Sequence, residues 1–151
     1  MSVITGEKLQ ELVTGCSNCL QSNIGFSEVN VKLDGTFWVE RVDTKPIRTD
    51  ALPEASEIYR EAEVGVFNLT PGEFVRAQIM ETFILPENVM GMFTIRSRYA
   101  QMGLDQAVSI LLKPNWAGKL ILELKNNLRY HNIRLVRGTC IGQIVFFRCG
   151  E

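Results

Sequence analysis

The sequence has a single histidine, a formal net charge of −1, and no apolar run that approaches the roughly 20 residues needed to span a bilayer. Its 16 Lys and Arg residues nearly balance its 17 Asp and Glu residues, so we expect no strong binding to nucleic acid or to an anionic membrane. The opening residues, MSVITGEKLQELV, have neither the basic start nor the long apolar stretch of a secretory signal. These absences predict a protein of the reducing cytoplasm.

The sequence also lacks the spacing of a structural zinc site. Cys16 and Cys19 form one CxxC pair, whereas Cys140 and Cys149 stand apart near the C-terminus, and a four-thiolate site normally uses two such pairs. A redox CxxC follows a strand and opens a helix, but this one follows a helical segment and enters a loop. We therefore expect free thiols, no metal site, and a solvated His131 in its polar turn.

The chain has 151 residues, of which 46% are hydrophobic and 22% charged, and this suits one domain covering residues 1–151. Residues 5–13 form a short amphipathic pattern that predicts a helix, with Thr5 as its N-cap. A second short helix is expected at residues 98–102, ended by Gly103. Residues 43–63 are polar and contain prolines, which predicts a surface loop with one helical turn at residues 54–61.

The remaining segments are strand-forming runs separated by Pro and Gly turns, a pattern typical of an all-β sandwich or barrel. Asp34-Gly35 predicts a tight hairpin between the first two strands. The expected strands cover residues 26–33, 36–42, 64–69, 74–85, 89–97, 107–112, 119–125, 133–136 and 141–147.

Polar side chains are concentrated between residues 95 and 123, inside strand-forming sequence, and this is where we expect a ligand site. Arg96 and Ser97 offer a guanidinium fork and a hydroxyl at the end of a strand, which suit phosphate oxygens, and Arg98 adds positive charge. The alternative is structural: Arg96 pairs with a carboxylate across a contact between subunits.

Glu123 lies between Leu122 and Leu124 on an expected strand. Alternation places its side chain on the face opposite both leucines, where it can line a pocket. An enclosed carboxylate has a raised pKa, which is useful for proton transfer. The alternative is that Glu123 is a buried partner of Arg96 or Arg98.

Three runs in the C-terminal part of the chain resemble, in order, the motifs of the dCTP deaminases and the related trimeric dUTPases. They are LTPGEFVRAQIMETFILPENVMGMFTIRSRYAQMGL, KPNWAGKLILELKN and IRLVRGTCIGQIVFF. The family shows a Pro-Gly-Glu turn, a strand ending in Leu-Pro, a Gly-Arg-Ser-Ser motif, an Asp-Pro-Gly-Trp turn with a following Leu-Glu strand, and a closing strand pair. The matching residues here are Arg96, Ser97, Ala100, Gly103, Leu104, Pro114, Trp116, Gly118, Leu122, Glu123 and Asn126.

The resemblance implies an all-β, dUTPase-like distorted β-barrel with a short N-terminal helix, assembled as a homotrimer with active sites between subunits. It implies no zinc, and a Mg²⁺ ion carried on a deoxynucleoside triphosphate. By resemblance, Arg96, Ser97 and Arg98 bind phosphate, and Glu123 is the general base that activates the water attacking the cytosine ring. Gln101, Ser109 and Trp116 fall at pocket positions, although Trp116 also suits a purely structural turn.

The sequence departs from the family pattern at several of these positions. Gln101 replaces an Arg, Lys113 replaces an Asp, and Ile95 replaces the first Gly of Gly-Arg-Ser-Ser. The segment 104–114 is one residue shorter, and the sequence ends at Glu151 without the arm that closes over the triphosphate in the family. A protonated lysine cannot act as the base that the family's Asp provides in dUTP hydrolysis.

Two functions follow from this pattern of retention and loss. The first is a divergent structural or binding trimer without full catalytic activity, for example a nucleotide sensor or a protein that decorates a viral capsid and lies in the virion. The second is a dCTP deaminase that hydrolyses dCTP to dUTP and ammonia. The sequence favours the first, because the positions needed by the fold are kept better than those needed by a triphosphate. The expected partners are further copies of the chain, with a deoxynucleoside triphosphate or a capsid protein.

Overall fold

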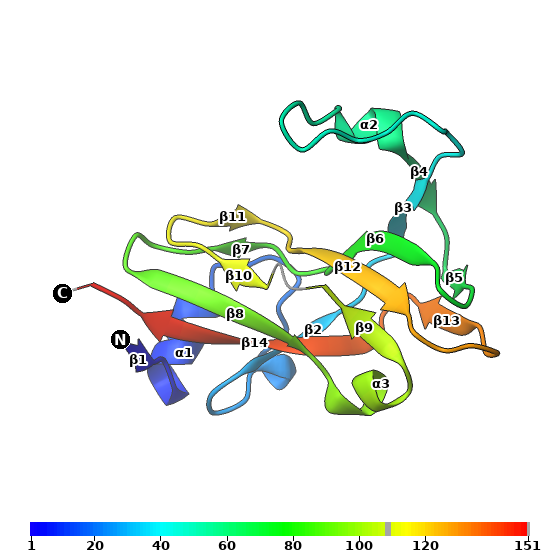
Figure 1. Cartoon of the computed structure of the whole chain (residues 1–151). Helices are drawn as coiled ribbons and strands as arrows, with labels where there is room; N and C mark the ends of the chain where they lie inside the picture. Colours follow the sequence, from blue (N-terminus) through cyan, green and yellow to red (C-terminus); the bar gives the residue numbers. More distant parts are fainter. Residues whose placement is uncertain (108–109, 151) are drawn as a thin grey trace.

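The computed structural model describes residues 1–107 and 110–150, which form antiparallel strands with a few short helices (Figure 1). In chain order, the elements are β1 (Ser2–Val3), α1 (Gly6–Val13), a 3₁₀ turn (Gln21–Asn23), β2 (Val29–Lys32), β3 (Thr36–Glu40), α2 (Ala55–Ile58), β4 (Tyr59–Glu63), β5 (Val66–Leu69), β6 (Phe74–Gln78), β7 (Phe83–Ile84), β8 (Val89–Ile95), α3 (Ser97–Gln101), β9 (Leu104–Gln106), β10 (Leu111–Leu112), β11 (Ala117–Gly118), β12 (Ile121–Asn126), β13 (Ile133–Val136) and β14 (Cys140–Arg148). The all-β fold expected from the sequence is confirmed.

Two five-stranded sheets make up most of the fold. One has the order β1-β14-β8-β10, with β2 also paired to β14, and the other has the order β4-β3-β6-β12-β9. The pairs β11-β7 and β13-β5 form two small additional sheets. The strands of the described residues therefore form four hydrogen-bonded sheets and do not close into a continuous barrel.

The core consists of large apolar side chains that the strands turn inward. Phe37, Phe83, Phe93 and Phe146 are fully buried, and the Phe83 and Phe146 rings lie 5.5 Å apart between centroids. A buried phenylalanine contributes about 2–3 kcal/mol of transfer free energy, so this group is a major source of stability. In α1, Leu9 and Val13 are buried as the amphipathic pattern predicts.

The predicted Asp34-Gly35 hairpin is wrong. Strand β2 pairs with β14, whereas β3 pairs with β4 and β6, so this dipeptide crosses from one sheet to the other. A type I′ turn needs positive φ at both central residues, and neither Asp34 nor Gly35 has it. Pairing of β2 with the long strand β14 overrides the local turn signal.

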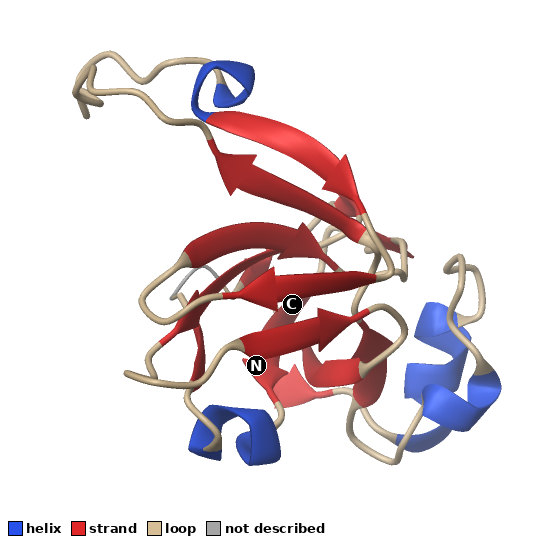
Figure 2. Cartoon of the chain, turned by 90° about the vertical axis from the view of Figure 1, so that its right-hand side faces the viewer, coloured by secondary structure: helices blue, strands red, loops and turns tan. Residues whose placement is uncertain are grey.

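The prediction of a loop over residues 43–63 is also wrong in its last part. Strand β4 pairs with β3 along its whole length, and α2 precedes it. The resulting ribbon projects from the body and carries residues 41–54 at its far end (Figures 1 and 2). Strand β4 lacks clear alternation because it is an edge strand and exposes charged residues.

Other boundaries differ in smaller ways. The expected strand 74–85 is two strands, β6 and β7, separated by a segment that contains the buried Glu81. Thr5 occupies the N-cap position of α1, but its side chain makes no capping hydrogen bond, contrary to prediction. Gly103 follows α3 with φ of +92°, which confirms it as the helix stop. No helix within the described ranges is long and apolar enough to cross a membrane.

Candidate functional site

Glu123 lies in the middle of β12 and points away from the core. Leu122 and Leu124 on either side are fully buried, while Glu123 is half-buried on the opposite face, as alternation predicts. Gln106 of β9 contacts it twice. The Gln106 side chain donates from Nε2 to Glu123 Oε2 at 3.3 Å and accepts the Glu123 backbone N–H at 3.1 Å. These contacts fix the carboxyl group against the neighbouring strand.

Arg76 of β6 is the residue directly opposite Glu123 in the antiparallel register. Its guanidinium carbon lies 5.7 Å from the centroid of the Trp38 ring and 5.1 Å from that of Tyr59. Trp38 is in turn the register partner of Arg76 on β3. One row across the sheet therefore places the Glu123 carboxylate, the Arg76 guanidinium and the Trp38 ring side by side, and Tyr59 contacts the guanidinium from a position two residues away from that row on β4.

The environment raises the pKa of Glu123. Burial is the largest influence and disfavours the charged form, while the Gln106 hydrogen bond and the positive charge of Arg76 partly oppose it. A carboxyl with a raised pKa can accept a proton and return it near neutral pH. This arrangement suits proton transfer to and from a bound ligand.

The expected phosphate-binding residues lie at the start of α3. The Arg96 backbone N–H donates to Ile141 O at 3.0 Å, and its own carbonyl accepts the N–H of Tyr99 at 3.0 Å. This backbone pairing holds the turn from β8 into the helix. The Arg96 side chain is half-buried, and Ser97 and Arg98 are exposed. Phosphate binding by these residues stays a prediction.

The structure does not bring the arginines at this helix start into an ion pair with Glu123. In the part of the chain that the structure describes, the ion pairs are Arg48–Asp50 and Lys119–Asp34. The structural alternative in which Glu123 pairs with Arg96 or Arg98 is therefore wrong within one chain. The side-chain partner of the Glu123 carboxylate is Gln106, which donates a hydrogen bond to it.

The expected pocket residues have separate surroundings. Gln101 is exposed at the end of α3, and Lys113 is exposed before β11. The Trp116 indole N–H donates to Gly118 O at 3.1 Å, which ties the ring to the turn that precedes β12. Ser109 lies outside the described residues.

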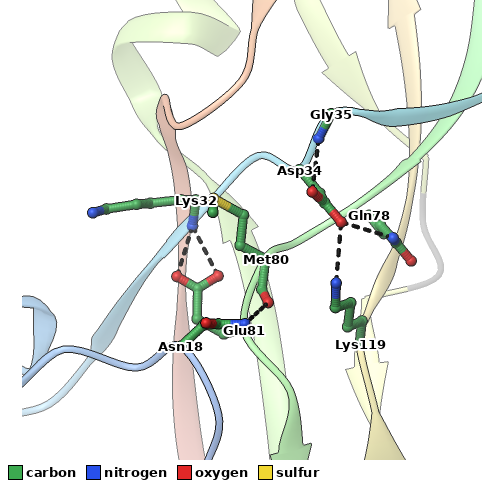
Figure 3. Close-up of polar contacts among 8 residues, drawn as sticks. All are labelled: Asn18, Lys32, Asp34, Gly35, Gln78, Met80, Glu81 and Lys119. Carbon is green, nitrogen blue, oxygen red and sulfur yellow. Dashed lines mark hydrogen bonds and ion pairs between the residues drawn. The ribbon is translucent and has the colours of Figure 1, made fainter. Parts of the chain in front are cut away.

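Two acidic residues that sequence reasoning missed hold the sheets together (Figure 3). Glu81 is fully buried, and both of its carboxylate oxygens accept the backbone N–H of Lys32 at 3.0 Å. Burial raises the pKa of Glu81, and the Lys32 hydrogen bond only partly opposes this. The signal that could have revealed Glu81 is a single carboxylate inside the apolar run FVRAQIMETFIL.

Asp34 is the second of these residues. Its carboxylate accepts Gly35 N–H at 2.8 Å, Gln78 Nε2 at 2.8 Å and Lys119 Nζ at 3.1 Å. Burial raises its pKa, but these donors outweigh burial and the net pKa is lowered. The dipeptide that resembled a hairpin signal is a polar anchor between the sheets.

The described residues contain no group of three or more His, Cys, Asp or Glu side chains that could hold a metal ion. The four cysteines are all free thiols, and His131 is exposed in its turn as predicted. Burial raises the pKa of Cys19 to about 11, with smaller contributions from Cys16 and Glu81, so this thiol is unreactive at neutral pH.

Comparison with known proteins identifies relatives over most of the chain. A family model described as dCTP deaminase-like matches residues 4–149. The dUMP-forming dCTP deaminase of Pseudarthrobacter chlorophenolicus is 32% identical over 126 residues, covering 81% of this chain and 65% of the relative. The dCTP deaminase of Actinobacillus pleuropneumoniae serotype 5b is 30% identical over 131 residues, covering 80% and 66%. The chain thus spans about two thirds of the length of these curated relatives.

Solved structures show the same fold. The 2'-deoxycytidine 5'-triphosphate deaminase from Agrobacterium tumefaciens matches with a TM-score of 0.75 at 16% identity, covering 99% of this chain and 48% of that chain. A dUTPase from phage phi11 of S. aureus matches with a TM-score of 0.51 at 16% identity, covering 57% and 72%. The expected dUTPase-like fold is confirmed, and because the family model spans residues 4–149, the chain belongs to the dCTP deaminase-like family.

Proposed function

We propose that this protein hydrolyses dCTP to dUTP and ammonia, with Glu123 as the general base. The observation that carries the proposal is the setting of Glu123, which is half-buried on the outward face of β12, bound by Gln106 and opposite Arg76. The relatives named dCTP deaminase support dCTP as the substrate and deamination as the reaction, although one of them is dUMP-forming. The reading as a structural trimer, a capsid-decorating protein or a nucleotide sensor receives no support from these comparisons.

The reaction needs one water molecule and one group that moves protons. The Glu123 carboxylate takes a proton from the water as its oxygen attacks C4 of the cytosine ring. This first proton passes from Glu123 to the ring nitrogen N3. The second proton of the water then passes through Glu123 to the exocyclic amine, and ammonia leaves as the C4 carbonyl forms. The balance is dCTP + H₂O → dUTP + NH₃, and Glu123 ends in its starting protonation state. General acid–base catalysis of this kind contributes roughly 10²–10⁴-fold to a rate.

Triphosphate binding is assigned to Arg96, Ser97 and Arg98 of a neighbouring copy in a homotrimer. Glu123 has no ion pair with these arginines in one chain, and a site shared between copies supplies the phosphate contacts that one copy lacks. A Mg²⁺ ion would arrive on the triphosphate oxygens, since the described residues offer no metal-binding cluster of their own. Gln101 and Trp116 are assigned to the pocket that the family resemblance implies, and Ser109, the third residue of that set, lies outside the described residues.

The product is dUTP rather than dUMP. Release of dUMP needs a second water activated for attack on phosphorus. Lys113 stands where the family has an aspartate, so this position offers no carboxylate to take that proton. One of the relatives is dUMP-forming, so both products must be measured.

The test is an assay of the purified chain with dCTP and Mg²⁺ that follows ammonia, dUTP, dUMP and pyrophosphate. We expect ammonia and dUTP in equal amounts, and a roughly 10²–10⁴-fold loss of kcat in Glu123→Gln. Glu87→Gln, at an exposed glutamate before β8, is the matched control and should keep full activity.

Two further results would decide between the readings. Binding of dCTP without turnover would overturn the enzyme and favour a binding trimer, and neither binding nor turnover by the folded protein would exclude both nucleotide functions. A monomer in light scattering at micromolar concentration would contradict the shared site.

A further inference from the structure

We propose that Arg76 is a positioning residue for Glu123: its guanidinium, held against Trp38 and Tyr59, supplies the fixed positive charge that faces the Glu123 carboxylate across β6 and β12. The inference rests on the proposed role of Glu123 as the base. It goes beyond that role, because it assigns a function to a residue outside the polar cluster of residues 95–123 and to the rings of the projecting ribbon.

Strand register puts the two charges on one face. Glu123 and Arg76 are direct partners in the β12–β6 pair, and the flanking partner pairs, Leu122 with Ala77 and Leu124 with Val75, are buried in the core. Directly paired residues of antiparallel strands share a face, so Arg76 and Glu123 both point outward. Opposite charges in such a pair attract each other.

The aromatic rings fix the guanidinium from the other flank. Trp38 is the partner of Arg76 on β3, and Tyr59 lies at the start of β4, with centroid distances of 5.7 and 5.1 Å. Contacts of this kind attract the guanidinium to the faces of both rings. Arg41 Nε donates to the Tyr59 carbonyl at 3.3 Å and to the Ser56 carbonyl at 3.1 Å, which fixes the outer end of the ribbon, where β3 ends and β4 begins.

The Arg76 side chain is not committed to another acceptor. It donates no hydrogen bond to any residue in the described ranges and belongs to neither of the ion pairs found there. The rings restrain the guanidinium without using its N–H groups. These groups therefore remain available on the face that Glu123 occupies.

Other charges on this face are placed less well to act on Glu123. Lys125 follows on the same strand and is paired in register with Asp105 of β9, and Glu61 lies beyond Trp38 on β4. Gln106 is neutral. Arg76 is the charged side chain that lowers the pKa of Glu123 against the larger effect of burial. Removing the Arg76 charge should therefore raise the pKa of Glu123 further.

The consequence is that the ribbon of β3 and β4 contributes to the chemistry. Trp38 and Tyr59 come from its two strands, and they contact the guanidinium that faces the proposed base. A change at the ribbon that releases the rings is therefore transmitted to Glu123 through one side chain.

The experiment is a carbon-13 NMR titration of the glutamate side-chain carboxyls in the full chain, with Glu123→Gln used to assign the Glu123 signal. Arg76→Met should move the Glu123 titration midpoint to higher pH, and Arg76→Lys should restore most of it. Lys125→Met removes a positive charge two residues along the same strand and is the matched control, which should leave the midpoint near that of the wild type. An unchanged midpoint in Arg76→Met, or an equal shift in Lys125→Met, would overturn the proposal.

A second readout separates the inference from the proposed function. In the deaminase assay, Arg76→Met should lower kcat at neutral pH and recover at higher pH, since the acidic limb of the profile follows the ionisation of Glu123. A shifted NMR midpoint in a protein without any deaminase activity would support the role of Arg76 toward Glu123 and reject only the proposed enzymatic function. Turnover of dCTP with an unchanged midpoint would support the proposed enzymatic function and reject the role of Arg76.

Discussion

Lys119 Nζ lies 3.1 Å from Asp34 Oδ2, and this ion pair joins the turn before β12 to the crossing between the two five-stranded sheets (Figure 3). The two side chains are 33% and 13% exposed. The Arg48–Asp50 pair is shorter, at 2.7 Å, but its side chains are 71% and 67% exposed, so water screens it. Burial and not distance decides which of the two ion pairs stabilises the fold.

Replacing Asp34 should therefore destabilise the protein more than replacing Asp50. Asp34→Ala leaves Gln78, Lys119 and the Gly35 N–H without their shared acceptor, and we expect the free energy of unfolding to fall by about 1–3 kcal/mol. Asp50→Ala should cost about 1 kcal/mol or less. Urea denaturation of both variants measures the difference, and equal losses would contradict the structural role of Asp34.

Gly142 of β14 is required by a close approach of two strands. A Cβ at this position would meet the Phe93 ring and the Thr94 carbonyl oxygen at 2.5 Å. The backbone oxygen cannot move without disturbing the pairing of β14 with β8, so Gly142→Ala should lower the free energy of unfolding by about 1–3 kcal/mol. Gly15→Ala, where a Cβ meets nothing within 4 Å, is the control and should be close to neutral. Thermal unfolding of both variants tests the contrast.

Local signals in the sequence predicted the class of fold and most strand positions. The expected strand at residues 133–136 is the observed β13, and alternation alone placed Glu123 outward between two buried leucines. Asp34-Gly35 misled because the partner of β2 is β14, which lies at the other end of the chain. Turn preference is local, whereas the choice of partner depends on the whole core.

The site was predictable to the same extent. Glu123 could be found, because a lone carboxylate in an apolar strand is visible in the sequence. Its neighbours Gln106 and Arg76 could not be found in the same way. The register between strands decides which residues lie beside Glu123, and this register cannot be read from the sequence. The family resemblance directed attention to Arg96, Ser97 and Arg98, and the phosphate-binding role proposed for them involves a second copy of the chain.

Asn126 anchors the loop after β12 and should be intolerant of replacement. It is fully buried, and its Nδ2 donates to the carbonyls of Leu69 and His131 at 3.0 and 2.9 Å while its Oδ1 accepts Leu128 N–H at 2.9 Å. Asn126→Ala leaves these three backbone groups without partners, and we expect a loss of about 2–4 kcal/mol. The neighbouring exposed Asn127 provides the control, since Asn127→Ala should be near neutral in the same denaturation experiment.

Glu81 should give the protein a recognisable pH dependence. Its pKa in the folded state is raised, so the folded state binds a proton more tightly than the unfolded state does. The stability contributed by Glu81 is complete below its unfolded pKa and is lost as pH rises through its folded pKa. Glu81→Gln keeps the size and one acceptor oxygen for Lys32 but removes the titration.

The measurement is the free energy of unfolding of wild type and Glu81→Gln between pH 4 and pH 7, where other carboxyls cancel in the difference. The wild type should lose stability relative to Glu81→Gln as pH rises. A constant difference would show that Glu81 titrates alike in the folded and unfolded states.

Gln106 should tune the proposed base from the side opposite Arg76. Its amide donates to Glu123 Oε2, and this hydrogen bond lowers a pKa that burial raises. Gln106→Leu removes the donor, so the Glu123 pKa should rise and the acidic limb of the deaminase profile should move to higher pH. The loss of kcat at neutral pH should be smaller than in Glu123→Gln, because the carboxylate is still present. Gln10→Leu, at an exposed position on α1, controls for the added apolar surface.

Since Gln106 and Arg76 act on one carboxylate, the effects of replacing them on the Glu123 pKa should be coupled rather than additive. An additive double variant would mean that one of the two acts on the site by another route.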